Sequence, residues 1–192
     1  MDLKKSFKLE LLNQLYKPYY NCKACPLGTL GRKHVVFGEG NPDAKLMFIG
    51  EGPGKEEDLQ GKPFIGRAGQ LLNRSLEAIG IQRKDVFITN IVKCRPPNNR
   101  TPTPTESQTC KNLLLIKQIQ IICPKVICTL GSAAIQGLLG KKTLKISQIR
   151  GKKILIEEII VVPTYHPAYI LRNPKELKIL IADLAFAYSL CS

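Results

Sequence analysis

Apolar residues in this chain follow two spacings, which together predict an alternation of strands and helices. Nearly continuous apolar runs are typical of strands that are buried on both faces of a sheet, and they cover 45–49, 86–92, 125–130 and 159–162. Apolar positions at helical spacing predict helices over 3–17, 68–79, 104–122, 132–139 and from 173 to about 188. The short run at 154–156 is expected to form a hairpin with 159–162.

Single residues mark the ends of several of these elements. Thr103 is placed to cap the long helix, and Glu106 three residues later completes a capping box. Gly80 closes the second helix, and Pro174 lies in the first turn of the last one. The alternation predicts an α/β fold with three layers, α/β/α, around a central, mainly parallel four-stranded sheet. A chain of 192 residues that is 44% hydrophobic suits a single domain over 1–192.

Net charge, apolar runs and cysteine count indicate which partners and which compartment to expect. The net charge of +14 predicts a polyanionic partner, most simply nucleic acid, although solubility or the lysine bias of an AT-rich genome would also raise it. No apolar run is long enough to span a bilayer, and the polar start Met1–Lys5 is not a signal peptide. With an odd count of seven cysteines, we expect reduced thiols and a cytoplasmic monomer that does not bind membranes.

Four cysteines form two widely separated pairs. Cys22 and Cys25 form a C-x-x-C motif followed by proline, while Cys94 and Cys110 bracket a Pro-, Asn- and Thr-rich stretch. Thiolates are soft ligands that suit Zn²⁺ or an iron–sulfur cluster. A redox-active C-x-x-C pair is the alternative, but it would not need the second pair. With no histidine nearby, the pattern favours a closed structural site, and spacing alone leaves zinc and a [4Fe–4S] cluster both open.

Three segments follow predicted strands, at the sheet edge where α/β proteins bind ligands. The first is the Gly-Glu-Gly-Pro-Gly turn at 50–54, whose glycines allow backbone amides to approach a ligand; it is neither a dinucleotide fingerprint nor a P-loop. The second holds Asn90, whose amide both donates and accepts, as the edge of a base requires. The third holds His166, followed by proline. Taken singly, each also suits a structural role in a turn or cap.

Together these segments resemble one family closely, the family 4 uracil-DNA glycosylases, which form the iron–sulfur branch of the uracil-DNA glycosylase superfamily. The resemblance runs from about Cys22 to Leu184, with matching motifs at 22–27, 36–42, 50–54, 61–69, 89–97 and 166–174. It implies a monofunctional DNA-repair enzyme that hydrolyses the N-glycosidic bond of deoxyuridine in single- or double-stranded DNA, releasing uracil and leaving an abasic site. A glycosylase for another deaminated base is the alternative within this class.

The resemblance also implies roles for individual residues. A [4Fe–4S] cluster would be held by Cys22, Cys25, Cys94 and Cys110. This closed site would not act in catalysis but would pin the N-terminal segment and the 95–109 loop beside the DNA. The remaining cysteines, Cys123, Cys128 and Cys191, match no family ligand and are expected to pack in the core.

In the base pocket, Phe64 would stack on the flipped uracil, Asn90 would read its polar edge, and the backbone at Gly50 and Gly52 would complete the pocket. His166 would stabilise the departing anion at the uracil O2. The best-known branch of the superfamily has an aspartate at the position of Gly52, which leaves Glu51 as the nearest carboxylate to orient water.

DNA outside the pocket would meet a wedge and basic side chains. Leu171 would fill the space that the flipped base leaves, Arg172 would reach a phosphate, and Arg95, Arg100 and Lys93 would lie near phosphates. Two rival classes remain: a non-catalytic nucleic-acid-binding module organised by the metal site, and an electron-transfer protein. The second explains neither the charge of +14 nor the base-pocket residues.

Overall fold

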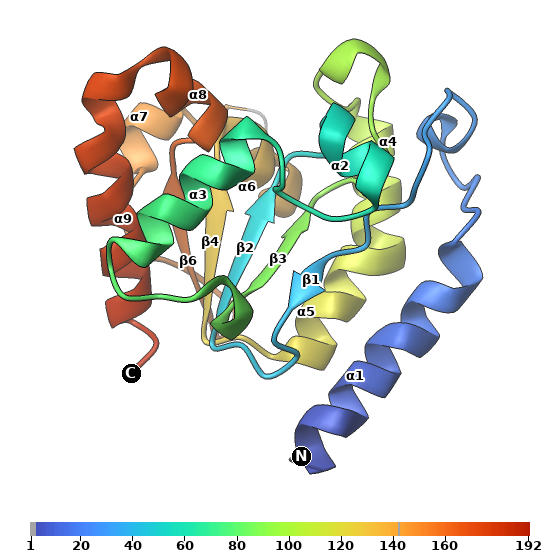
Figure 1. Cartoon of the computed structure of the whole chain (residues 1–192), viewed down its shortest axis with the longest axis horizontal. Coiled ribbons are helices and arrows are strands. Elements are labelled where there is room, and N and C mark those ends of the chain that lie inside the picture. The colour runs from blue at the N-terminus through green and yellow to red at the C-terminus, as the bar shows by residue number, and fades with distance from the viewer. Residues whose placement is uncertain (1–2, 142) are drawn as a thin grey trace.

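A computed structural model describes residues 3–141 and 143–192 of the chain (Figure 1). Within these residues, one sheet has six strands in the order β1-β3-β2-β4-β6-β5. The strands are β1 (Glu39–Gly40), β2 (Leu46–Gly50), β3 (Phe87–Asn90), β4 (Val126–Leu130), β5 (Ile154–Ile156) and β6 (Ile159–Thr164). The predicted α/β class is therefore confirmed.

The prediction of four strands is wrong, because two short antiparallel strands extend the sheet at its edges. The four inner strands are parallel, as predicted, whereas β1 pairs antiparallel with β3 and β5 antiparallel with β6. The two residues of β1 are exposed, so this strand gives no buried apolar run, whereas β5 belongs to the predicted hairpin of 154–156 with 159–162, which is confirmed. In the parallel register Gly50 lies beside Asn90, so the carboxyl ends of the strands meet at one edge.

Helices cover both faces of this sheet, as Figure 1 shows: α3, α8 and α9 lie on the near face, and α5 and α6 on the far face. Helix α1 packs on α5, outside the sheet. The helices are α1 (Leu3–Tyr16), α2 (Lys55–Gln60), α3 (Arg67–Glu77), α4 (Pro104–Cys110), α5 (Ile116–Ile122), α6 (Ser132–Leu139), α7 (Ile146–Ile149), α8 (Pro167–Arg172) and α9 (Leu177–Ser189).

Two buried clusters result from the alternation of side chains along the inner strands. Leu46 and Phe48 in β2 face the cluster that contains the buried leucines of α3 and α9. Met47 and Ile49, one residue out of phase, face the cluster beneath α5 and α6. Because both faces are covered, all five residues of β2 are buried, which explains its uninterrupted apolar sequence.

The helix predicted over 104–122 exists but is interrupted. The Thr103 side chain accepts from the Glu106 N–H, and the Glu106 carboxylate accepts from the Thr103 N–H, so the capping box is confirmed. A π-helical segment, Lys111–Leu115, then separates α4 from α5 directly after Cys110. Such a wide turn adds a residue without breaking the helix, so apolar spacing does not reveal it. In residues 3–141 and 143–192, no helix is long and apolar enough to cross a membrane.

Candidate active site

A cavity of about 470 Å³ opens at the edge where β2, β3 and β6 end. Its lining includes Glu51, Gly52, Phe64, Asn90 and His166, which come from four separate stretches of the sequence. Gly50 lies at the base of this group, and a Cβ built there would collide with the Asn90 amide and the Phe64 ring. The structure therefore brings together the residues assigned to the base pocket.

Phe64 is held in place by an unusual backbone and by neighbouring side chains. Its φ of +50° lies in the left-handed region, which costs a non-glycine residue about 1 kcal/mol or more. The Arg83 guanidinium donates to the carbonyl oxygens of Phe64 at 3.1 Å and Pro63 at 2.5 Å. The Phe64 ring lies 5.8 Å from the His166 ring, centroid to centroid. This support fixes the aromatic ring as one wall of the cavity before any ligand arrives.

Glu57 is a member of the site that sequence reasoning missed. It lines the cavity from α2, and its Oε1 accepts from the backbone N–H groups of Ile65 at 3.0 Å and Gly66 at 2.8 Å. The carboxylate thereby holds the loop that carries Phe64. A glutamate three residues after the glycine-rich turn was the available signal, but its partners lie eight and nine residues further along the chain.

Asn90 ends β3 with its side chain enclosed. The residue is 1% exposed, and its buried Oδ1 has no hydrogen-bond partner among residues 3–141 and 143–192. An unsatisfied buried polar group costs roughly 1–3 kcal/mol, so its persistence suggests a ligand donor that completes it. The amide lines the cavity beside Phe64 and His166, where a planar ligand would find both a stacking surface and a polar edge.

His166 is the N-cap of α8, and its proton position follows from that geometry. Nδ1 accepts from the Ala168 N–H at 3.1 Å, so the proton of the neutral ring is on Nε2. Burial lowers the pKa of His166 to about 4, with Arg172 acting in the same direction and Glu57 opposing it. At neutral pH the ring is therefore an uncharged donor. Gly131 leaves room for it, because a Cβ there would lie 2.9 Å from the His166 Cβ.

The segment after His166 forms a helix that the sequence did not predict. Residues Pro167–Arg172 form the short helix α8, with Pro167 in its first turn and a His166 cap. Six residues are too few to give a clear helical spacing of apolar positions, which is why the sequence did not predict this helix. The α8 helix places Ala168, Tyr169 and Arg172 on the cavity wall.

Glu51 lies between two cavities. It lines the base cavity and also a neighbouring one of about 690 Å³ near α4 and α6. Burial raises the pKa of the Glu51 carboxyl, and a side-chain hydrogen bond with Thr101 acts in the opposite direction. A carboxylate with a raised pKa accepts a proton more readily than an exposed one, as a general base requires.

The residues assigned to DNA contacts lie in different settings. Arg172 is exposed and lines the cavity, whereas Arg95 donates from Nε to Asn99 at 2.8 Å. Leu171 is half-buried and packs against the cluster beneath α3 and α9. Arg100 lines the cavity and forms a two-bond pair with Glu106, at 2.8 and 2.7 Å. Lys93 is fully buried, so the expectation that it lies near a phosphate is wrong.

The four paired cysteines line one small cavity of their own. Cys22, Cys25, Cys94 and Cys110 meet there, although about seventy residues separate the two pairs. The Lys93 backbone N–H donates to the Cys110 Sγ at 3.3 Å. Burial raises the pKa of Cys94 to about 12 and of Cys110 to about 11, so these groups ionise only when a cation compensates them.

This donor set consists of four thiols, the number of ligands that a four-iron cluster takes. Residues 3–141 and 143–192 contain no group of three or more His, Cys, Asp or Glu side chains placed to hold one metal ion. A four-iron cluster needs a different arrangement, since each cysteine binds its own iron.

Of the other cysteines, Cys128 and Cys191 are buried as expected, but Cys123 is exposed at the end of α5, where φ is +53°.

Comparisons with known proteins agree with this arrangement. The family model described as the uracil DNA glycosylase superfamily matches residues 37–185. A type-4 uracil-DNA glycosylase from Thermotoga maritima is 49% identical over 183 residues, which cover 94% of each chain. A type-4 uracil-DNA glycosylase from Sulfurisphaera tokodaii is 45% identical over 183 residues, covering 91% of this chain and 82% of the relative. One from Archaeoglobus fulgidus is 41% identical over 174 residues, covering 87% and 86%.

Proposed function

We propose that this protein, which belongs to the uracil-DNA glycosylase superfamily, removes uracil from DNA. Within the superfamily it belongs to the type-4 enzymes. It hydrolyses the N-glycosidic bond of deoxyuridine, releases uracil and leaves an abasic site in an intact strand. The reaction belongs to base excision repair of DNA.

One observation carries the assignment of the pocket: in the described part of the chain, the buried Asn90 Oδ1 has no partner, and it lies in the cavity that Phe64 and His166 also line. Uracil offers matching groups, since its N3–H donates and its O2 and O4 accept. The Asn90 amide pairs with N3–H and O4, and the Phe64 ring stacks on the base. A site built to satisfy this edge discriminates strongly against bases that leave it unpaired.

Bond cleavage needs a donor for the base and an acceptor for a proton of water. The nucleotide first leaves the base stack, because its glycosidic bond is inaccessible within a duplex. As the C–N bond breaks, its electron pair leaves with uracil, and the sugar becomes cationic. The neutral His166 donates from Nε2 to the O2 of the uracil anion. Water adds its oxygen to C1′, and Glu51 accepts its proton.

The cysteine-lined cavity holds a [4Fe–4S] cluster in this proposal. Cys22, Cys25, Cys94 and Cys110 supply one thiolate each, and the group supplies structural cross-linking rather than chemistry at the base. Protein purified anaerobically is expected to be yellow-brown, with about four irons per chain. Stoichiometric zinc without iron in a metal analysis would refute this cofactor.

DNA contacts outside the pocket extend along α8 and the loop after β3. Arg172 and Arg95 contact phosphates, and Leu171 enters the duplex where the base has left it. The 192 residues act as one domain and a monomer. The contacts with phosphates orient the strand, whereas Asn90 provides the selection of the base.

Single-uracil oligonucleotides test the function directly. Uracil release, followed by alkaline cleavage of the abasic product, is expected for the wild-type protein without added metal. His166→Ala should lower the single-turnover rate by about 10²–10³, the usual effect of losing one preorganised donor to a developing anion. Asn90→Ala should lower both the rate and the preference for uracil.

Cys123→Ser is the matched control, because Cys123 is exposed and does not line the cavity. Single-turnover rates within threefold of wild type for both His166→Ala and Asn90→Ala would contradict the pocket. Trapping of a covalent enzyme–DNA adduct by borohydride would contradict simple hydrolysis.

A further inference from the structure

Lys93 has an environment that the assigned chemistry does not explain. Its side chain is 0% exposed, although lysine is almost never fully buried unless it is paired. Nζ donates to the Thr89 Oγ1 at 2.5 Å and to the backbone oxygen of Asn90 at 2.8 Å. Both acceptors are uncharged, so these hydrogen bonds orient Nζ without supplying a countercharge.

The compensating charge does not come from a carboxylate. Within the part of the chain that the structure describes, the ion pairs are Lys8–Asp43, Arg100–Glu106 and Arg150–Asp183, and none includes Lys93. Lys93 instead lines the cavity of the four cysteines, and its own N–H donates to the Cys110 Sγ. A [4Fe–4S] core bound by four thiolates carries about two negative charges, which would lie beside this lysine.

The hydrogen bonds of Lys93 Nζ reach the end of β3, where Asn90 lines the base pocket. Thr89, which accepts from Lys93, donates in turn to the Phe37 carbonyl at 2.8 Å, and the Gln118 amide donates to the same carbonyl at 2.8 Å. These groups are buried, so the end of β3 is fixed from several directions. Among the residues that the structure describes, the Asn90 Oδ1 has no hydrogen-bond partner, and Lys93 holds the backbone of this same residue.

We propose that Lys93 is a positioning residue that connects the cysteine-lined site to Asn90. Its charge offsets the thiolate-bound cluster, and its two hydrogen bonds hold the end of β3 so that the Asn90 amide meets the base. The inference rests on the cofactor and the base pocket proposed above. It assigns the cluster an effect on base recognition that passes through one side chain, without any chemistry at iron.

Lys93→Met tests both halves of this proposal in the cluster-loaded protein, because methionine fills a similar space without charge or N–H donors. The single-turnover rate of uracil release should fall about tenfold to a hundredfold, the scale expected when a binding group is misplaced. In an Asn90→Ala background the same substitution should change the rate by no more than about twofold, because the two residues act through one contact.

The cluster provides readouts that do not depend on activity. Loss of the nearby positive charge should shift the cluster reduction potential to more negative values and shorten the half-life of the cluster under chelation. Lys93→Gln keeps an N–H donor but no charge, so it should retain more of the rate while showing the same shift in potential. Lys93→Gln also replaces Lys93→Met as the test variant if Lys93→Met does not accumulate as folded protein.

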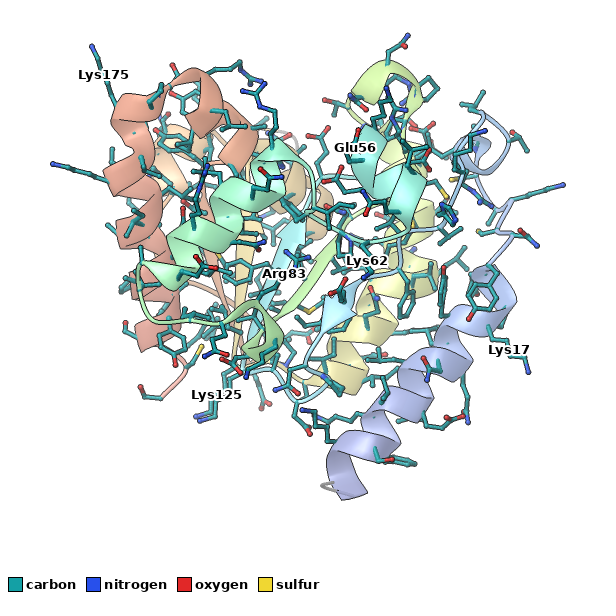
Figure 2. All side chains as sticks on the ribbon, in the orientation of Figure 1. Lys17, Glu56, Lys62, Arg83, Lys125 and Lys175 are labelled. Atoms are coloured by element: carbon teal, nitrogen blue, oxygen red, sulfur yellow. The ribbon has the colours of Figure 1, made fainter. Side chains whose placement is uncertain are left out.

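Lys125→Met is the control, since Lys125 is an exposed lysine at the opposite end of the molecule (Figure 2). It should change neither the rate nor the potential. Additive rate losses in the Asn90→Ala background, or an unchanged potential in both Lys93 variants, would overturn the proposal. Wild-type protein that contains no iron would overturn the cofactor as well, and this is measured before any variant is made.

Discussion

At the level of single residues, His166 combines a fixed proton position with a low pKa. The Ala168 N–H donates a hydrogen bond to Nδ1, and burial lowers the pKa of His166 to about 4. Both effects favour the neutral ring in the folded protein. An unfolded chain has no such restriction, and its histidines have a pKa near 6.5. The folded and unfolded states therefore bind different numbers of protons between about pH 4 and 6.5.

This difference predicts how stability depends on pH. The contribution from neutral His166 is complete above pH 6.5 and is lost as the pH falls toward 4, because the unfolded state takes up the proton first. Relative to His166→Gln, which does not titrate, wild type should lose about 2 kcal/mol of unfolding free energy between pH 7 and pH 5. Urea unfolding of both proteins at the two pH values measures this loss. A constant difference between them would contradict the assigned pKa.

The next scale is that of the elements, where α8 joins the pocket to the predicted wedge. His166 begins this helix, and Leu171 and Arg172 form its last turn. A side chain that fills the vacated space matters most when the base was well paired, because flipping then costs several kcal/mol. Leu171→Ala should therefore slow uracil removal most opposite adenine, less opposite guanine and least in single strands.

The alternative role for Leu171 has a different signature. The side chain is half-buried and packs against the cluster beneath α3 and α9, so it also contributes to the core. If packing is its only role, Leu171→Ala should slow all three substrates equally and lower the melting temperature. Measuring the three rates together with thermal stability separates the two roles.

Elements also differ in how well the sequence predicted them. The inner strands β2, β3, β4 and β6 are buried on both faces, so continuous apolar runs identified them. The two-residue strand β1 and the six-residue helix α8 are too short to produce a period. The π-helical segment after Cys110 inserts a residue into an otherwise regular helix, which apolar spacing does not record.

In the candidate site, too, residues in local motifs were predicted and residues that depend on distant contacts were missed. Phe64, Asn90 and His166 were predicted because each lies in a motif of adjacent residues. Glu57 and Gly131 were missed because their roles depend on neighbours that are distant in the sequence, the 65–66 backbone for one and His166 for the other. The burial of Lys93 was missed for a related reason, since a lysine between Asn90 and Arg95 has the sequence context of a surface residue.

For the molecule as a whole, the positive charge is spread widely. The net charge is +14, and Figure 2 shows Lys17, Lys125 and Lys175 extending from three different sides. Only lysine and arginine side chains that contact phosphates release counterions from the DNA. The slope of log K against log salt therefore reports the number of such contacts. Arg172→Ala should weaken binding to uracil-containing duplex and reduce the slope of log K against log salt by about one.

A lysine remote from the cavity supplies the comparison. Lys125→Met removes the same charge from the other end of the molecule and should leave the slope unchanged. Fluorescence anisotropy between 50 and 200 mM salt measures both slopes in the range where phosphate contacts dominate. Equal changes in the two variants would indicate general attraction rather than a phosphate contact by Arg172.

The cavity of the four cysteines also bears on the order in which the chain acquires structure during synthesis. Cys22 and Cys25 leave the ribosome early, but their partners Cys94 and Cys110 follow only after about seventy further residues. Domains form as their segments emerge, and closing so long a loop carries an entropic cost. We therefore expect the segment with Cys22 and Cys25 to be anchored only after the later pair has emerged. Until then, the reduced pair 22/25 remains accessible on the nascent chain.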